Sequence, residues 1–227
     1  MKQKVLVGCP TSELKGYALE RYVKGVKSLK YGKFDVLIVD NSRGEEYCQK
    51  INRLGLPAVR GPYSKSARQR IVDSRNILRQ KVLDEGYDYF FSLEQDVIPP
   101  TDALQNLLNH GKDIVTGVYF SYQTNNGVTL LVPLLWQKVK NDEMRFMLEK
   151  EVTEQKLLEV GACGLGCILI HRDVLEKIKF RFNKEDNSFD DMWFCKDASD
   201  AGFKIFADTS IKCKHLIKDW RWDGINK

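Results

Sequence analysis

Residues 88–96 read DYFFSLEQD, an apolar run that leads directly into two acidic side chains. A continuous apolar run of this length is typical of a strand that is buried on both faces of a parallel sheet. Glu94 and Asp96 then fall at the carboxyl end of the strand, where a carboxylate needs water, a hydrogen-bonding partner or a metal ion. Carboxylate oxygens at the end of a rigid strand are well placed to hold a hard divalent cation. The segment therefore predicts a central strand with a cation site at its tip.

The segments around this strand alternate between buried strands and helices. Apolar runs at residues 5–9, 34–39 and 113–118 predict three more strands. Helical spacing of apolar residues predicts helices over residues 14–29 and 66–85. Such strand–helix alternation favours an α/β fold with an open, mostly parallel sheet.

The second half of the chain has a different character. We expect antiparallel strands and loops over residues 127–136 and 144–161, and a single strand over residues 162–170. No repeat, low-complexity segment or linker interrupts the sequence, so one domain over residues 1–227 is predicted. It would have a donor half (1–118), an acceptor half (119–216) and a tail (217–227). The remaining expected elements are helices over 172–177 and 190–201 and short strands over 204–207 and 211–215.

Composition sets limits on the partners and the compartment. The 227 residues carry a net charge of +5, which suits an anionic ligand or an anionic lipid surface. The basic residues are scattered, which argues against a nucleic-acid partner. Six cysteines without a CxxC pair predict buried free thiols in a reducing cytoplasm. The apolar run near the N-terminus is too short for a signal peptide or a membrane span, so we expect a soluble cytoplasmic protein, with peripheral membrane contact left open.

Polar side chains follow the first three predicted strands. Thr11 comes after the first strand, Asp40 after the second, and Glu94 with Asp96 after the third. In an open parallel sheet, ligands bind at the carboxyl ends of the strands. These residues are therefore candidates for a shared ligand site.

Two further charged positions stand out on the predicted helices. Arg75 lies on the apolar stripe of helix 66–85, where it needs an anionic partner: a bound anion, Asp40 or Asp96 would serve, and the alternative is a purely structural ion pair. Asp191 lies at the centre of the apolar face of helix 190–201, and Asp190 lies near its edge. Carboxylates in a first helical turn stabilise the helix dipole, but an inward-pointing carboxylate favours a general base over a cap.

Several motifs resemble those of GT-A glycosyltransferases, in particular glycosyltransferase family two. Glu94-Gln95-Asp96 resembles the Asp-x-Asp motif of these enzymes, with Glu94 in place of the first aspartate. The resemblance covers most of the chain, from about residue 4 to residue 216. The other matching segments, in chain order, are Val39-Asp40-Asn41-Ser42, Ser74-Arg75-Asn76, the glycine-rich stretch Gly161 to Cys167, Asp190-Asp191 with Gly202-Phe203-Lys204-Ile205 after it, and the late strand from Ile211 to His215.

The resemblance implies a fold, a reaction and a metal ion. The fold would be the GT-A fold, a Rossmann-like three-layer α/β/α sandwich. The reaction would move a sugar from a UDP- or GDP-linked donor to the hydroxyl of a saccharide, a lipid-linked molecule or another acceptor. Asp96, His215 and Glu94 would hold Mn²⁺ or Mg²⁺ on the diphosphate.

The resemblance also implies roles for the other candidate residues. Thr11 and Asp40 would hold the base and ribose of the donor, and Arg75 would add positive charge nearby. Asp191 would be the general base of an inverting transfer. Asp190, which replaces the glutamate of the family motif, would be a second acceptor-binding carboxylate, and the two roles could be exchanged.

Other classes of protein remain as alternatives. A sugar nucleotidyltransferase or a methyltransferase would usually have a glycine-rich loop after the first strand, whereas this chain has Pro10-Thr11-Ser12-Glu13 there. A non-catalytic nucleotide-sugar or carbohydrate-binding protein would not need the Asp190-Asp191 pair.

Overall fold

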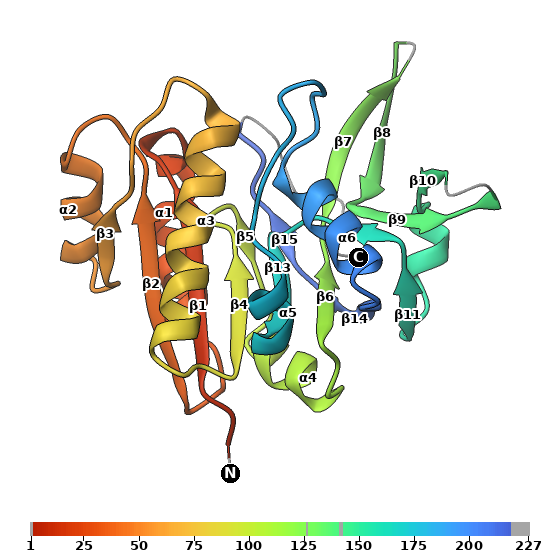
Figure 1. Cartoon of the computed structure of the whole chain (residues 1–227), viewed down its shortest axis with the longest axis horizontal. Helices are drawn as coiled ribbons and strands as arrows, with labels where there is room; N and C mark the ends of the chain where they lie inside the picture. Colours follow the sequence, from red (N-terminus) through yellow and green to blue (C-terminus); the bar gives the residue numbers. More distant parts are fainter. Residues whose placement is uncertain (1, 126, 141–142, 219–227) are drawn as a thin grey trace.

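The computed structural model describes residues 2–125, 127–140 and 143–218, and its core is an eight-stranded sheet (Figure 1). Four of the seven strand pairings are parallel: β1 with β2 and β4, β2 with β3, and β6 with β14. β13 runs antiparallel to both of its neighbours, and β11 runs antiparallel to β14. In sheet order the strands are β11 (Leu157–Val160), β14 (Ile205–Lys212), β6 (Ile114–Val118), β13 (Cys167–His171), β4 (Tyr89–Leu93), β1 (Val5–Thr11), β2 (Phe34–Asp40) and β3 (Ala58–Arg60).

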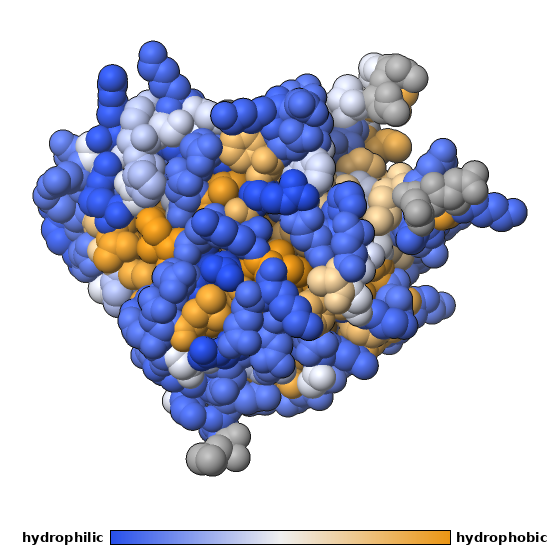
Figure 2. All heavy atoms as spheres, in the orientation of Figure 1, coloured by the Kyte–Doolittle hydropathy of each residue, from blue (hydrophilic) through white to orange (hydrophobic). Residues whose placement is uncertain are grey.

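Helices cover both faces of this sheet, which makes three layers. In β1, Leu6 packs into one hydrophobic core while Val5 and Val7 pack into the other, because successive strand residues point to opposite faces. Figure 2 shows that the face with α3, α5 and α6 is mostly hydrophilic, with hydrophobic residues in patches between the helices. The first core takes residues from α3 (Ala67–Asp84), α5 (Arg172–Lys177) and α6 (Asp190–Asp200), and the second from α1 (Leu19–Lys27), α2 (Glu46–Arg53) and α4 (Ala103–Asn109).

The predicted α/β/α sandwich with a mostly parallel sheet is thus confirmed. The strand expected over 88–93 is the central strand β4, and the helix expected over 66–85 is α3, whose N-cap Ser66 accepts a hydrogen bond from the Gln69 amide. The helix expected over 14–29 begins as a 3-10 helix (Glu13–Ala18) and continues as α1.

Smaller elements surround the sheet in the second half. The hairpin of β7 (Phe120–Asn125) and β8 (Val128–Pro133) projects from the body of the molecule (Figure 1). A short 3-10 helix (Glu149–Val152) lies between β10 and β11. The other small sheets are β10 (Met144–Phe146), β9 (Leu135–Lys138) and β12 (Ala162–Cys163), and the pair β5 (Val97–Ile98) with β15 (Lys214–His215).

The strand expected over 162–170 is broken into β12 and β13. The turn between them packs against Tyr119, whose hydroxyl accepts a hydrogen bond from the Gly166 amide at 2.9 Å. A Cβ on Gly164 would lie 2.2 Å from that hydroxyl oxygen, so only glycine allows this close approach. The strand expected over 204–207 is longer, because β14 continues to Lys212 through a register shift.

Other expectations concern membrane-spanning helices, the cysteines and the division of the chain into halves. In the described part of the chain, none of the helices has the length and apolar character needed to cross a membrane. All six cysteines are buried free thiols. Of the predicted tail, residues 219–227 lie outside the described residues, and the division at residue 118 stays a prediction.

Candidate active site

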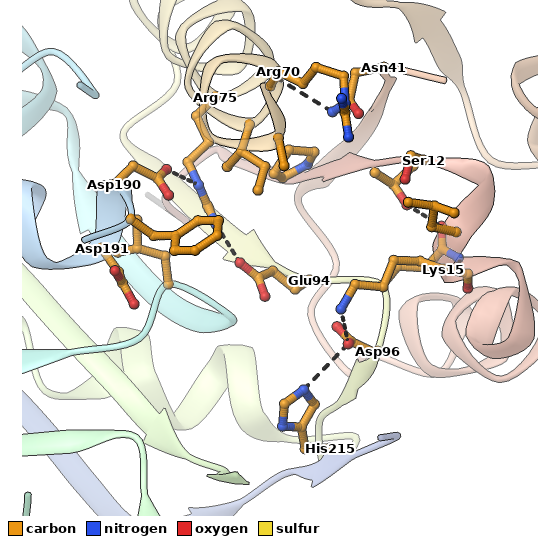
Figure 3. Close-up of a pocket in the computed structure, with 18 of the residues that line it drawn as sticks. Ser12, Lys15, Asn41, Arg70, Arg75, Glu94, Asp96, Asp190, Asp191 and His215 are labelled. Carbon is orange, nitrogen blue, oxygen red and sulfur yellow. Dashed lines mark hydrogen bonds and ion pairs between the residues drawn. The ribbon is translucent and has the colours of Figure 1, made fainter. Parts of the chain in front are cut away.

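A cavity of about 400 Å³ lies at the carboxyl ends of β1, β2 and β4 (Figure 3). The strand register explains its position. Thr11 pairs with Asp40, and Gly8 pairs with Ser92, so the carboxyl ends of the three parallel strands lie side by side. The charged residues that line the cavity are Lys15, Arg70, Arg75, Glu94, Asp96, Asp190, Asp191 and His215.

Asp96 is the most tightly surrounded carboxylate of this cavity. Its Oδ2 contacts the Lys15 ammonium group, accepts a hydrogen bond from the Tyr17 hydroxyl at 3.2 Å and lies 3.4 Å from His215 Nε2. Its Oδ1 is buried and has no hydrogen-bond partner among the described residues. Burial alone would raise the pKa of Asp96, but His215 and Lys15 outweigh burial and hold the pKa well below its usual range.

His215 is held in place from its other side. It lies on β15, which pairs with β5, and its Nδ1 is 2.8 Å from the carbonyl oxygen of Phe120. Because a carbonyl only accepts, we assign a hydrogen to Nδ1, and Nε2, which faces Asp96, donates to that carboxylate when the ring is protonated. Burial lowers the pKa of His215, but the hydrogen bond and charge of Asp96 outweigh burial, so that its pKa is raised.

Arg75 contacts two carboxylates, those of Glu94 and Asp190. It is 1% exposed, its Nη1 donates to Ser92 Oγ at 2.6 Å, and its Nη2 forms an ion pair with Glu94. Its Nε lies 2.6 Å from Asp190 Oδ2, an ion pair whose angle does not allow a hydrogen bond. The expected partners Asp40 and Asp96 are therefore corrected to Glu94 and Asp190, and the structural ion pair is present.

Asp190 and Asp191 begin α6 and both line the cavity. Asp190 is the more buried of the two, at 4% exposed, because it turns towards Arg75. This corrects the expectation that Asp191 occupies the centre of the buried face. Asp191 accepts a hydrogen bond from the Met192 amide at 2.8 Å. Burial, and then the charge of Asp190, raise the pKa of Asp191 to about 6, which suits a proton acceptor near neutral pH.

Asp40 and Thr11 follow neighbouring strands but have different surroundings. Asp40 is fully buried and is not among the residues that line the cavity. It accepts hydrogen bonds from the amide and hydroxyl groups of Ser42 and pairs with Arg60 at 2.9 Å. Thr11 lines the cavity and donates to Gln95 Oε1 at 2.7 Å.

Comparison with known proteins gives matches in structure only. No family model matches the chain, and no curated protein matches it in sequence. A197 from STIV is similar in structure over 95% of this chain and 86% of its own, with a TM-score of 0.52 and 21% identity. GalNAc-T7, solved with UDP, GalNAc and Mn²⁺, is similar over 96% of this chain and 45% of its own, with a TM-score of 0.66 and 12% identity. Residues 1–349 of S. aureus TarS, solved with UDP-GlcNAc, are similar over 96% of this chain and 62% of their own, with a TM-score of 0.56 and 13% identity.

The chain has the GT-A fold. GalNAc-T7 and TarS are GT-A glycosyltransferases, and their structural similarity to this chain extends over 96% of it. The chain spans less than half of GalNAc-T7.

The GT-A fold raises the question of a divalent cation, and two donors in the cavity fit one. Asp96 offers an Oδ1 that has no hydrogen-bond partner in the described part of the chain, and His215 offers Nε2 once that nitrogen has given up its hydrogen; a carboxylate oxygen and an imidazole nitrogen suit Mn²⁺. Glu94 contributes less, because Arg75 holds one of its oxygens. Within the described ranges, no three His, Cys, Asp or Glu side chains gather into a complete metal site. Phosphate oxygens and water would have to complete the coordination, as is usual for Mg²⁺ on nucleotides.

Several residues that were given no role from the sequence line this cavity, among them Asn41, Lys15 and Gln95. Asn41 lines it beside the buried Asp40, and Lys15 reaches into it from the segment after β1. Gln95 fastens the surrounding segments, since its Nε2 donates to the Lys15 carbonyl oxygen at 2.6 Å and to the Tyr47 hydroxyl. Gln95 carried a signal in its place between Glu94 and Asp96, and Asn41 in the segment Val39-Asp40-Asn41-Ser42, whereas Lys15 carried none.

Proposed function

We propose that this chain is a glycosyltransferase, which moves a sugar from a UDP- or GDP-linked donor to an acceptor hydroxyl. One observation carries the proposal: Asp96, whose buried Oδ1 has no hydrogen-bond partner among the described residues, lines the same cavity as the Asp190-Asp191 pair. The GT-A fold supports it, and the motif order favours family two. GalNAc-T7 with UDP, GalNAc and Mn²⁺ and TarS with UDP-GlcNAc are precedents for the ligands.

The diphosphate of the donor would lie over Asp96. Asp96 and His215 would hold Mn²⁺ or Mg²⁺, with Glu94 close by. When bound, the cation would supply positive charge that neutralises the diphosphate as it leaves. Thr11 would position the ribose, and Asn41 is better placed than Asp40 to meet the base, because Asp40 is enclosed by Ser42 and Arg60.

The acceptor would react at the opposite wall of the cavity, where Asp190 and Asp191 lie in Figure 3. Asp191 would take the proton of the acceptor hydroxyl as the oxygen attacks the anomeric carbon. The bond from that carbon to the diphosphate breaks in the same step, so the configuration inverts. Asp190 would act mainly through its charge, which favours the protonated form of Asp191. The acceptor class, whether saccharide, lipid-linked or another hydroxyl compound, and peripheral membrane contact stay predictions.

The first experiment is a thermal-shift screen of UDP- and GDP-sugars, with and without Mn²⁺, on the wild type and on Asp96→Asn. A donor at about 100-fold its Kd should raise the Tm by about 5 °C or more. We expect this shift for one donor, in the wild type with Mn²⁺ present, and a much smaller shift without Mn²⁺ or in Asp96→Asn. If no nucleotide sugar shifts the Tm under any condition, the proposal is wrong. If a donor binds but is neither transferred nor hydrolysed, the chain is a nucleotide-sugar-binding protein instead.

A further inference from the structure

We propose that Lys15 is a built-in competitor for the cation site. Its ammonium group neutralises Asp96 and must leave that carboxylate before a divalent cation can bind there. The freed ammonium group then contacts the donor diphosphate, so cation and donor strengthen each other's binding. The inference rests on the proposed function, because the cation is the one that would assist sugar transfer.

The contacts of Asp96 are unequal on its two oxygens. Lys15, Tyr17 and His215 all approach Oδ2, whereas Oδ1 has no hydrogen-bond partner in the described part of the chain. A divalent ion on this carboxylate would lie next to the Lys15 ammonium group. Two cations at such close range repel each other strongly in a partly buried site. Lys15 and the divalent ion therefore exclude each other at Asp96.

The Lys15 side chain can leave Asp96 while the backbone of Lys15 stays in place. Its amide donates to the Ser12 carbonyl at 2.9 Å, and its carbonyl accepts from Gln95, so the backbone is fixed at both ends. The side chain is 43% exposed, while that of Asp96 is 2% exposed. The flexible stem can therefore rotate without disturbing the fold.

The released ammonium group would stay in the cavity. Lys15 lines its wall together with Ser12 and Asp96, and Figure 3 shows its side chain reaching into the space from the segment after β1. The diphosphate of the proposed donor would lie in this space, and a phosphate oxygen is a strong partner for a lysine. A donor that holds Lys15 away from Asp96 favours the cation, and by linkage the cation favours the donor to the same extent.

The test measures Mn²⁺ binding by calorimetry, with no turnover involved. We expect Lys15→Gln to bind Mn²⁺ about tenfold tighter than the wild type, because a repelling charge is removed. Lys15→Arg keeps the charge and should bind about as the wild type does. Lys24→Gln, an exposed lysine on α1, is the matched control and should change nothing. Asp96→Asn should abolish binding, which assigns the site.

A second arm uses UDP as the probe. Without metal, Lys15→Gln should bind UDP more weakly than the wild type, the opposite sign to its effect on Mn²⁺, which a folding defect cannot produce. UDP should tighten Mn²⁺ binding more in the wild type than in Lys15→Gln. Equal or weaker Mn²⁺ binding by Lys15→Gln, or no Mn²⁺ binding by either protein, overturns the inference. In that last case metal-free sugar transfer by the wild type would leave the proposed reaction standing.

Discussion

Asp191 changes its charge near neutral pH, because burial and Asp190 raise its pKa to about 6. As a general base it works only when deprotonated, so kcat should rise with pH through about 6 and then level off. We expect Asp191→Asn to lower kcat by about 10²–10⁴-fold with donor affinity retained. Asp200→Asn, an exposed residue on the same helix, is the control. Near-normal turnover by Asp191→Asn with bound metal would contradict both the role of Asp191 as general base and the inverting mechanism.

The same raised pKa makes a prediction about stability. The folded pKa of Asp191 lies above its ordinary value of 3.8, so ionising it costs the folded state free energy above pH 6 and nothing below about pH 4. Asp191→Asn should therefore raise the free energy of unfolding at pH 8 by about 1–2 kcal/mol, after allowing for solvent screening. Urea denaturation at pH 4 should show little difference from the wild type. Destabilisation at both pH values would contradict the raised pKa.

Some site residues could be read from the sequence because one local pattern places them. Glu94 and Asp96 follow a strand that is buried throughout, and Arg75 falls on the apolar stripe of a long helix. The ion-pair partners of these residues could not be predicted from the sequence, because they depend on contacts between distant segments. Lys15 reaches Asp96 across 81 positions of sequence, and Arg75 reaches Asp190 across 115. No spacing pattern in the sequence predicts ion pairs between residues so far apart in the chain.

Gln95 couples three elements around the cavity. Its side chain accepts from Thr11 at the end of β1, donates to the Lys15 carbonyl and donates to Tyr47 on α2. Gln95→Ala would leave buried polar groups unpaired, so we expect a loss of about 1–3 kcal/mol in unfolding free energy. The donor KM should rise as well, because the segment after β1 is no longer fixed. Gln105→Ala is the control, since the Gln105 side chain donates to Asn109 on the exposed side of α4. Equal effects of the two substitutions would argue against this coupling.

The elements that were predicted well are long or wholly buried. β1, β2, β4 and β6 are mostly apolar runs, and α3 is a helix of 18 residues with Val72, Leu78 and Val82 buried along it. α2 and β3 were not anticipated because they are short: α2 has eight residues, with Tyr47, Cys48 and Ile51 buried, and β3 has three. The break between β12 and β13 was missed because it depends on Tyr119 packing against Gly164, a contact made in three dimensions.

At the scale of the whole molecule, the two cores hold a rigid sheet whose strand ends support the cavity. The first half of the chain contributes Lys15 and Asp96, and the second half contributes His215, Asp190 and Asp191. The cavity is therefore complete only when both halves are folded together, which suits a reaction between a donor and an acceptor.

The most direct measurement of the central claim is a crystal structure with UDP and Mn²⁺, recorded with anomalous scattering from manganese. The account predicts one manganese peak within bonding distance of Asp96 and His215, with the diphosphate across it and the Lys15 side chain turned from Asp96 to a phosphate oxygen. A bound UDP with Lys15 still on Asp96 and no manganese peak there would contradict it.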